Sequence, residues 1–233
     1  MTGVFRRMLD RLRDEVETPP VIAAPVYIVA SPFKTASTTV GKALLHLNAG
    51  RHEMVFHGQL QQKYGTCFRE INKTVPEDVS AKRWIADNQL EVRQTLSGLT
   101  RRLARFDIYS DAPFGHTHLH PFARKAIAPQ ARFIWVNRPM DEWLDSVRRW
   151  EIAHPDVYPR HVVWARNPEG RATTLRKRWD RHHKQFERLA ADYPQDCLEL
   201  SVDDLEDYRA LAAFCGVAAP AGALRKHNVS RDD

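Results

Sequence analysis

The sequence predicts an α/β fold, a three-layer domain in which helices cover both faces of a central parallel sheet. Short apolar, β-branched runs alternate along the chain with stretches of helical periodicity, which is typical of parallel sheets. The two clearest runs, residues 26–30 (VYIVA) and 132–136 (RFIWV), are apolar at nearly every position, as expected of strands buried on both faces. With 233 residues, of which 43% are hydrophobic and 27% charged, the chain fits one large globular domain.

Residues 1–20 are predicted to form an N-terminal amphipathic helix, ended by Pro19 and Pro20. Its arginines and apolar side chains also suit a membrane surface, but docking on its own domain is the favoured interpretation. Residues 21–233 are predicted to form a single α/β domain. We expect a cytoplasmic protein, because the N-terminus has no apolar signal-peptide region and no apolar run approaches the roughly 20 residues of a membrane span.

The remaining elements follow in order along the chain. A loop over residues 31–36 leads from the first strand into a helix that begins at Ser37 and stops at residues 48–50 (NAG). Residues 58–80 show no clear pattern. The further predicted elements are a strand at 54–56, a helix at 81–106 capped by Ser80, strands at 107–110 and 132–136, a helix carrying residues 143–150, a basic helix at 176–191, a strand at 197–200 and a helix at 205–214 ending at Gly216.

The formal net charge of +6 comes from 35 basic and 29 acidic residues, and most of the basic residues are arginine. Guanidinium groups bind phosphate and sulfate through two parallel hydrogen bonds, so this surplus indicates an anionic partner. On the basic helix, His182 and His183 are predicted to face solvent. The three cysteines, at positions 67, 197 and 215, are odd in number and widely spaced, which excludes a disulfide framework and a zinc site.

The loop after the first strand has the features of a phosphate-binding site. Backbone N–H groups and the positive end of the helix dipole meet an anion where such a loop enters a helix. Lys34 adds a point charge there. The nucleotide-triphosphatase motif GxxxxGK[ST] is absent: its nearest counterpart, residues 36–43 (ASTTVGKA), lacks the first glycine and the final hydroxyl residue. Gly41 and Lys42 are therefore predicted to be ordinary helix residues.

The segment SPFKTASTT, residues 31–39, resembles the P-loop-like 5′-phosphosulfate loop of sulfotransferases, closest to the carbohydrate-type and bacterial members. It departs from that pattern at Phe33, which separates proline from lysine, and at Ala36, where glycine is common. A second segment resembles the family's 3′-phosphate motif: the strand RFIWV leads to Arg138-Pro139, and Ser146 follows eight residues after the arginine. Residues 108–114 (IYSDAPF) and the C-terminal segment are also similar to family segments.

This resemblance implies transfer of a sulfuryl group from 3′-phosphoadenylyl sulfate (PAPS) to a hydroxyl or amine, with 3′-phosphoadenosine 5′-phosphate (PAP) as product and no metal. By analogy, Lys34 stabilises the leaving phosphate, while Arg138 and Ser146 bind the 3′-phosphate. Arg225 and Lys226 are further candidates for that phosphate. The residues implied to hold the 5′-phosphate and the sulfate are Lys34, Thr35, Ala36, Ser37, Thr38 and Thr39.

The base that removes the acceptor's proton has two leading candidates, His57 and Asp111, and His116 and His118 also stay open for this role. His57 is favoured because the ordinary pKa of imidazole suits proton transfer at neutral pH, and Asp111 is second. His116, His118 and His120 alternate in sequence, as metal ligands on one face of a strand would. A loop beside the acceptor cleft is the favoured interpretation, because Gly115 and Pro121 flank these histidines.

The acceptor is expected to be a small molecule, a carbohydrate or a lipid. Its specificity is expected to come from residues 51–80, 112–125 and 150–175, which lie between the motifs. Two alternatives remain: a small-molecule or nucleotide kinase with a degraded phosphate loop, and a basic nucleic-acid-binding protein that uses the arginine-rich helix at 176–191. We expect no nucleic-acid partner, and the sequence leaves the oligomeric state undetermined.

Overall fold

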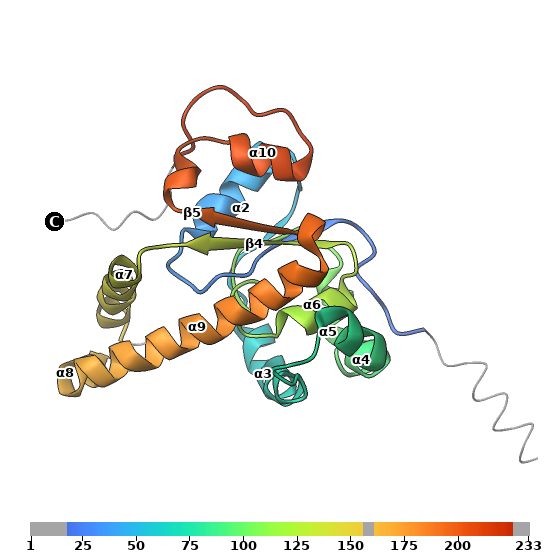
Figure 1. Ribbon diagram of the computed structural model, residues 1–233, viewed down its shortest axis with the longest axis horizontal. Helices are drawn as coiled ribbons and strands as arrows, with labels where there is room; N and C mark the ends of the chain where they lie inside the picture. The colour runs from blue at the N-terminus through green and yellow to red at the C-terminus, as the bar shows by residue number, and fades with distance from the viewer. Residues whose placement is uncertain (1–17, 156–160, 226–233) are drawn as a thin grey trace, which may run out of the picture.

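The computed structural model describes residues 18–155 and 161–225 (Figure 1). Its centre is a five-stranded sheet in the order β2-β3-β1-β4-β5, in which every neighbouring pair is parallel. The strands are β1 (Val26–Val29), β2 (Glu53–Met54), β3 (Ile108–Tyr109), β4 (Ala131–Asn137) and β5 (Cys197–Ser201). The predicted α/β class is confirmed. Most of the predicted helix at residues 1–20 lies outside the described residues.

Helices cover both faces of the sheet, so the predicted three layers are present. Alternate residues of β1 enter two separate cores: Val26 and Ile28 pack into one, Tyr27 and Val29 into the other. Figure 1 shows α2 and α10 over one face, with α3 to α6 and α9 over the other. The helices are α2 (Ser37–His46), α3 (Gly58–Lys73), α4 (Ala81–Thr95), α5 (Ser97–Leu103), α6 (Pro121–Ile127), α7 (Met140–Ala153), α8 (His161–Arg166), α9 (Pro168–Asp192) and α10 (Arg209–Cys215).

Several predicted elements have different bounds. Helix α3 occupies part of the segment that showed no pattern, and it buries about one residue per turn: Leu60, Tyr64, Phe68 and Ile71. The single helix predicted at 81–106 is two helices, α4 and α5, because the chain breaks at Leu96 before the weak helix formers Ser97 and Gly98. Strand β2 ends at Met54, α9 begins eight residues earlier than expected, and α10 begins only at Arg209.

The histidines of α9 are not solvated as predicted. His182 and His183 are both half-buried, and the ring of His183 lies 5.0 Å from that of Trp135 in β4. The prediction failed because the apolar positions of a helix identify its buried face but not which polar residues at the edge of that face also contact the sheet.

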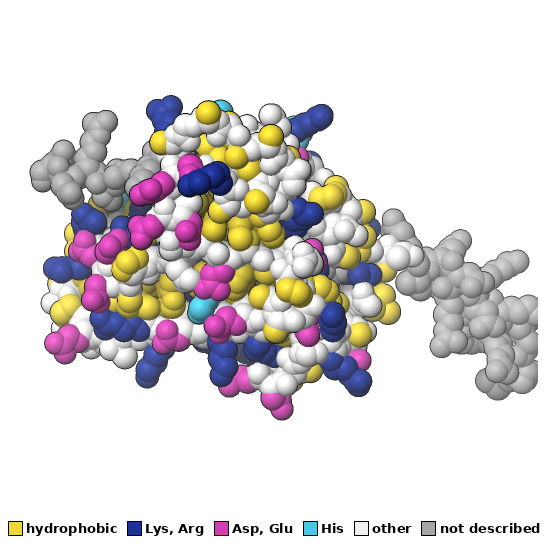
Figure 2. All heavy atoms as spheres, turned by 45° about the horizontal axis from the view of Figure 1, so that its top comes forward, with side chains coloured by type: hydrophobic (Ala, Val, Ile, Leu, Met, Phe, Trp, Pro, Cys, Tyr) yellow, Lys and Arg dark blue, Asp and Glu magenta, His cyan; other side chains and the backbone are white. Residues whose placement is uncertain are grey.

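No helix among the described residues is long and apolar enough to cross a membrane. On the face seen in Figure 2, lysine and arginine side chains are interspersed with aspartate and glutamate, with no large patch of one sign.

Gly41 and Lys42 lie within α2, as predicted, and their role is structural. Glu53 of β2 is buried between Lys42, whose Nζ lies 2.6 Å from Glu53 Oε2, and the hydroxyl of Ser110. A Cβ atom at position 41 would lie 2.2 Å from Glu53 Oε1 and 2.7 Å from Ser110 Cβ. Glycine is therefore required there for α2 to sit against the ends of β2 and β3.

We expect Gly41→Ala to destabilise the protein by about 1–3 kcal/mol, since a new methyl group must displace the buried carboxylate of Glu53. The matched control is Gly65→Ala in α3, where a Cβ would meet nothing within 4 Å. That substitution is expected to stabilise by about 0.5–1 kcal/mol through helix propensity alone. Urea denaturation of both variants measures the difference, and equal effects would contradict the packing argument.

Candidate active site

The loop between β1 and α2 has an unusual backbone conformation. Lys34 and Ala36 both have φ of 67°, in the left-handed region that residues with a side chain seldom occupy. Left-handed residues in a tight turn direct backbone N–H groups into concavities that bind anions. Ala36 is also the N-cap of α2 and makes no side-chain capping bond. Position 36, where alanine stands in place of the glycine common in the resembling loops, thus has a conformation that glycine would adopt more easily.

Side chains inside the loop hold this shape. The buried hydroxyl of Thr35 donates to the carbonyl of Pro32 at 2.7 Å and accepts from the Ser31 hydroxyl at 2.8 Å. The Thr35 hydroxyl is therefore engaged within the loop, so that Thr35 would bind an anion through its backbone N–H and not through its side chain. The other predicted hydroxyl residues, Ser37, Thr38 and Thr39, form the first turn of α2.

The two segments identified from the sequence meet in space. Arg138 Nη1 donates to the carbonyl of Lys34 at 3.2 Å, and Trp143 Nε1 donates to the carbonyl of Phe33 at 2.8 Å. The ring of Phe33 packs edge-on against Trp150, with centroids 5.6 Å apart. Phe33 thus anchors the loop to α7, which explains its position between proline and lysine.

The loop carries concentrated positive charge. Burial lowers the pKa of Lys34, and the positive charges of Arg138 and Arg149 lower it further. Arg138 is paired with the exposed Glu142 at 3.5 Å, and Arg149 with Asp145 at 3.2 Å. A bound anion would relieve the repulsion among the three cations, so the electrostatics of the site favour an anionic ligand.

The other residues predicted for the 3′-phosphate are placed unequally. Ser146 is buried on α7, the helix that begins two residues after Arg138. Arg225 is exposed at the end of the described chain, and Lys226 lies beyond it. The roles of these residues toward a phosphate stay predictions.

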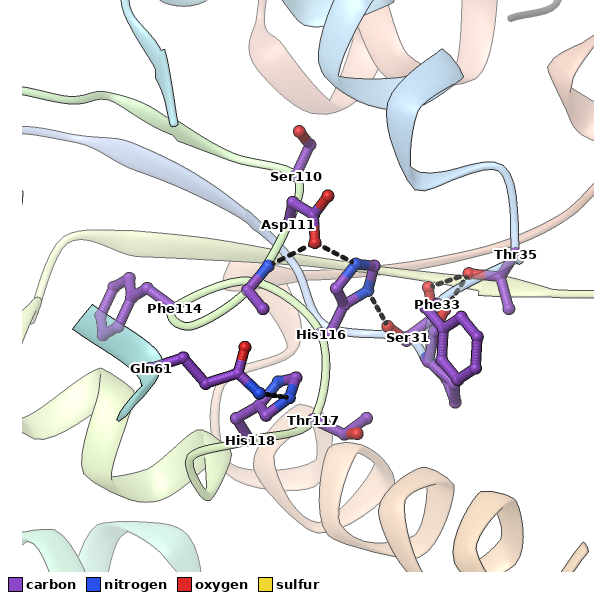
Figure 3. Close-up of polar contacts among 12 residues, drawn as sticks. Ser31, Phe33, Thr35, Gln61, Ser110, Asp111, Phe114, His116, Thr117 and His118 are labelled. Carbon is purple, nitrogen blue, oxygen red and sulfur yellow. Dashed lines mark hydrogen bonds and ion pairs between the residues drawn. The ribbon is translucent and has the colours of Figure 1, made fainter. Parts of the chain in front are cut away.

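Beyond β3, the partly exposed Asp111 and the buried His116 form a pair next to the loop after β1 (Figure 3). His116 Nε2 donates to Asp111 Oδ1 at 3.1 Å, and Nδ1 donates to the carbonyl of Ser31, also at 3.1 Å. Both ring nitrogens thus face oxygen atoms, and the imidazole bridges the carboxylate and the carbonyl of the loop after β1. Burial by itself would raise the pKa of Asp111, but the hydrogen bond and charge of His116 and the backbone N–H of Ala112 outweigh it, so the pKa is lowered.

Two features keep the loop after β3 closed over this pair. Gly115 packs on backbone, since a Cβ there would lie 2.6 Å from the carbonyl oxygen of Asp111. Arg124 of α6 is fully buried, and its Nη1 donates to the carbonyls of Phe114 at 3.1 Å and His116 at 2.9 Å. The sequence analysis missed Arg124; an arginine within an otherwise apolar helix, PFARKAI, was the available signal.

The favoured base candidate, His57, lies close to the second candidate. The N–H of His57 donates to the carbonyl of Ala112 at 3.0 Å, next to Asp111. Its Nδ1 accepts from Leu60 N at 3.4 Å, which caps the start of α3. The structure thus brings both predicted bases to the carboxyl end of β3 without choosing between them.

The alternating histidines do not share a strand face. His116 pairs with Asp111, whereas His118 Nε2 lies 3.0 Å from Gln61 Nε2 of α3. His120 caps α6 by accepting from Phe122 N. They lie in a loop, as favoured. Within residues 18–155 and 161–225, no group of three or more histidine, cysteine or acidic side chains could hold a metal ion.

Comparison with known proteins identifies one family. The model of a family described as a sulfotransferase domain matches residues 27–169, a span that contains the loop after β1, the Asp111–His116 pair and Arg138. No curated protein matches the chain significantly.

We expect Ala36→Gly to stabilise the protein by about 0.5–1 kcal/mol, since removal of Cβ relieves the left-handed conformation. As a control, Ala86→Gly on the exposed side of α4 should destabilise by about 1 kcal/mol. Thermal or urea denaturation of both variants checks the signs. Destabilisation by Ala36→Gly would show that the loop is not strained at this residue.

Proposed function

Because this chain belongs to the sulfotransferase family, we propose that it transfers a sulfuryl group from PAPS to a hydroxyl or amine of an acceptor. The observation that carries the proposal is the contact between the two phosphate-binding segments, made by the hydrogen bonds from Arg138 to Lys34 and from Trp143 to Phe33. It supports a single site for a donor that bears a 5′-phosphosulfate and a 3′-phosphate.

In this proposal the loop binds the 5′ end of the donor. The backbone N–H groups around Ala36 and the first turn of α2 hold the phosphate and sulfate, and Lys34 stabilises the charge that develops on the leaving oxygen. Arg138 and Ser146 hold the 3′-phosphate. The acceptor oxygen or nitrogen attacks sulfur in line, the bond from sulfur to the 5′-phosphate oxygen breaks, and PAP leaves with the electron pair. Protein cations neutralise the charge that a metal ion carries in kinases.

We assign the base to Asp111. Its Oδ2 makes no hydrogen bond with the described residues, and its side chain is 38% exposed, so it can take a proton from an acceptor. His116 orients this carboxylate and joins it to Ser31, the first residue of the loop. His57 remains the alternative, although its Nδ1 is directed to the backbone of α3.

The two other functions that the sequence left open have weaker support. A kinase would need the phosphate-loop glycine and hydroxyl residue that the chain lacks, and Lys42, its nearest counterpart to the kinase lysine, is paired with Glu53. A nucleic-acid surface on α9 would use the arginines of this helix together, but two of them are engaged within the protein. Arg171 binds the buried Glu151, and Arg188 donates to the carbonyls of Pro76 and Val79.

We expect PAP to raise the melting temperature of the protein, and Arg138→Ala to weaken PAP binding more than tenfold, since a charged hydrogen bond contributes roughly 1.5–3 kcal/mol. Calorimetric titration measures the affinity. The control is Arg148→Ala, which removes an exposed arginine from the same helix and should change the affinity less than twofold. Stabilisation by ATP–magnesium but not by PAP would contradict the proposed donor.

The assignment of the base predicts that Asp111→Asn lowers kcat by roughly 10²–10⁴-fold, the usual contribution of a general base, with PAP affinity unchanged. His57→Gln is the matched control and should cost less than tenfold. Because the pKa of Asp111 is lowered, kcat/KM should stay level as the pH falls from 8 to 5. An acid limb near 6.5, the ordinary value for a histidine, would favour His57 instead.

A further inference from the structure

We propose that the cavity between α3, the loop after β3 and α9 is the acceptor subsite, and that it takes an acceptor bearing a carboxylate, sulfate or phosphate group in addition to its reactive hydroxyl or amine. This inference rests on the proposed function, because it names the substrate class for the same site. The cavity has a volume of about 560 Å³, within the usual range for small-molecule sites.

The cavity adjoins the proposed base. Thr117 and His118 line it and directly follow His116, which pairs with Asp111. Figure 3 shows Thr117, His118 and Gln61 beside the Asp111–His116 pair, on the side away from Ser110. Asp111 itself does not line the cavity; in our proposal a molecule held between α3 and α9 extends past Thr117 to bring its hydroxyl to Asp111.

The charge of the lining has one sign. Arg69 comes from α3, and Arg178 and Arg181 come from α9, whereas no aspartate or glutamate of the described chain lines the cavity. Arg178, Arg181 and His182 stand at i, i+3 and i+4, so one face of α9 points at the cavity. Arg69 donates to the Thr66 hydroxyl at 3.1 Å, and within the described residues neither Arg69 nor Arg181 makes an ion pair.

The pKa values of the two histidines that line the cavity are lowered by burial and by this positive charge. Burial, followed by the charges of His116, Arg178 and Arg124, lowers the pKa of His118 to about 4. Burial and the charge of Arg178 likewise lower the pKa of His182 to about 3. Both rings are therefore neutral at neutral pH. They offer hydrogen bonds, while the arginines supply the positive charge that selects an anion.

Two buried polar atoms at the cavity also lack partners. His118 Nδ1 and Gln61 Oε1 make no hydrogen bond with the described residues, although the two side chains contact each other through Nε2 of each. An unpaired buried polar atom is costly. Both atoms are shielded from the cavity, so a bound molecule would reach them only after the Gln61 or His118 side chain turns.

Gly65 provides a charge-specific test. It lines the cavity from α3, and a Cβ there would meet nothing within 4 Å, so a longer side chain enters open space without strain. Gly65→Glu places a carboxylate one turn before Arg69, where it competes with an anionic acceptor. Gly65→Gln is the matched control, with nearly the same size and no charge. Arg181→Gln removes one of the cations directly.

The probes share one skeleton: 4-hydroxybenzoate, 4-hydroxybenzenesulfonate and 4-hydroxyphenyl phosphate, with 4-hydroxybenzamide as the neutral reference. Their affinities are measured by calorimetry with PAP saturating the donor site. We expect at least one anion to bind ten times more tightly than the amide. Gly65→Glu and Arg181→Gln should each lower the affinity for that anion by roughly tenfold or more, the usual effect of losing a charged contact. Gly65→Gln should leave the preference for the anion over the amide unchanged.

The outcomes separate the two proposals. Equal or absent binding of anions and amide, or equal effects of Gly65→Glu and Gly65→Gln, would overturn the anionic subsite while PAP still binds. Failure of PAP itself to bind the parent protein would overturn the proposed donor instead. Among the anions, the tightest probe identifies whether carboxylate, sulfate or phosphate is the preferred group.

Discussion

The phosphate loop keeps its shape because a distant part of the chain holds it. Two loop carbonyls, those of Phe33 and Lys34, accept hydrogen bonds from Trp143 and Arg138, which lie more than 100 residues further along the chain. Without these bonds, a short loop with two left-handed residues would depend on its own hydroxyl contacts, the packing of Phe33 on Trp150 and the bond between Ser31 and His116. The parallel sheet makes the contact possible, since β1 and β4 are neighbours and both loops leave from their carboxyl ends.

The site combines a cluster of positive charges around Lys34 with a carboxylate–imidazole pair at the end of β3. Around Lys34, the positive charges of Arg138 and Arg149 add to the effect of burial and lower the pKa of the lysine, an arrangement that favours an anionic ligand. At the end of β3, the charges of Asp111 and His116 compensate each other, which keeps a carboxylate ionised in a partly buried place. The loop after β1 thus suits charge binding and the loop after β3 suits proton transfer. The carbonyl of Ser31, bonded to His116, connects the two.

The sheet, the loops after β1 and β4 and the helices that follow them could be predicted from sequence because each is encoded locally, by a buried apolar run followed by a helix start. Helix α3 was missed because only four of its residues are buried and the rest are polar. Of the residues that line the proposed acceptor subsite, Gln61 and Thr117 lie within the ranges expected from the sequence, whereas Arg178 and Arg181 of α9 do not. Which face of a basic helix meets a cavity depends on the packing of other elements, and so do the roles of His116 and Arg124.

One aromatic contact spans both halves of the site. Trp143, which bonds the phosphate loop, lies 4.8 Å from Trp179, the neighbour of Arg178 in α9. Both rings are buried, and Trp179 also packs edge-on against Trp135 of the sheet. In terms of the proposed function, a substitution that re-aims α9 toward a new acceptor would also shift Trp179 against the residue that holds the loop after β1. Donor binding and acceptor choice would then be mechanically coupled.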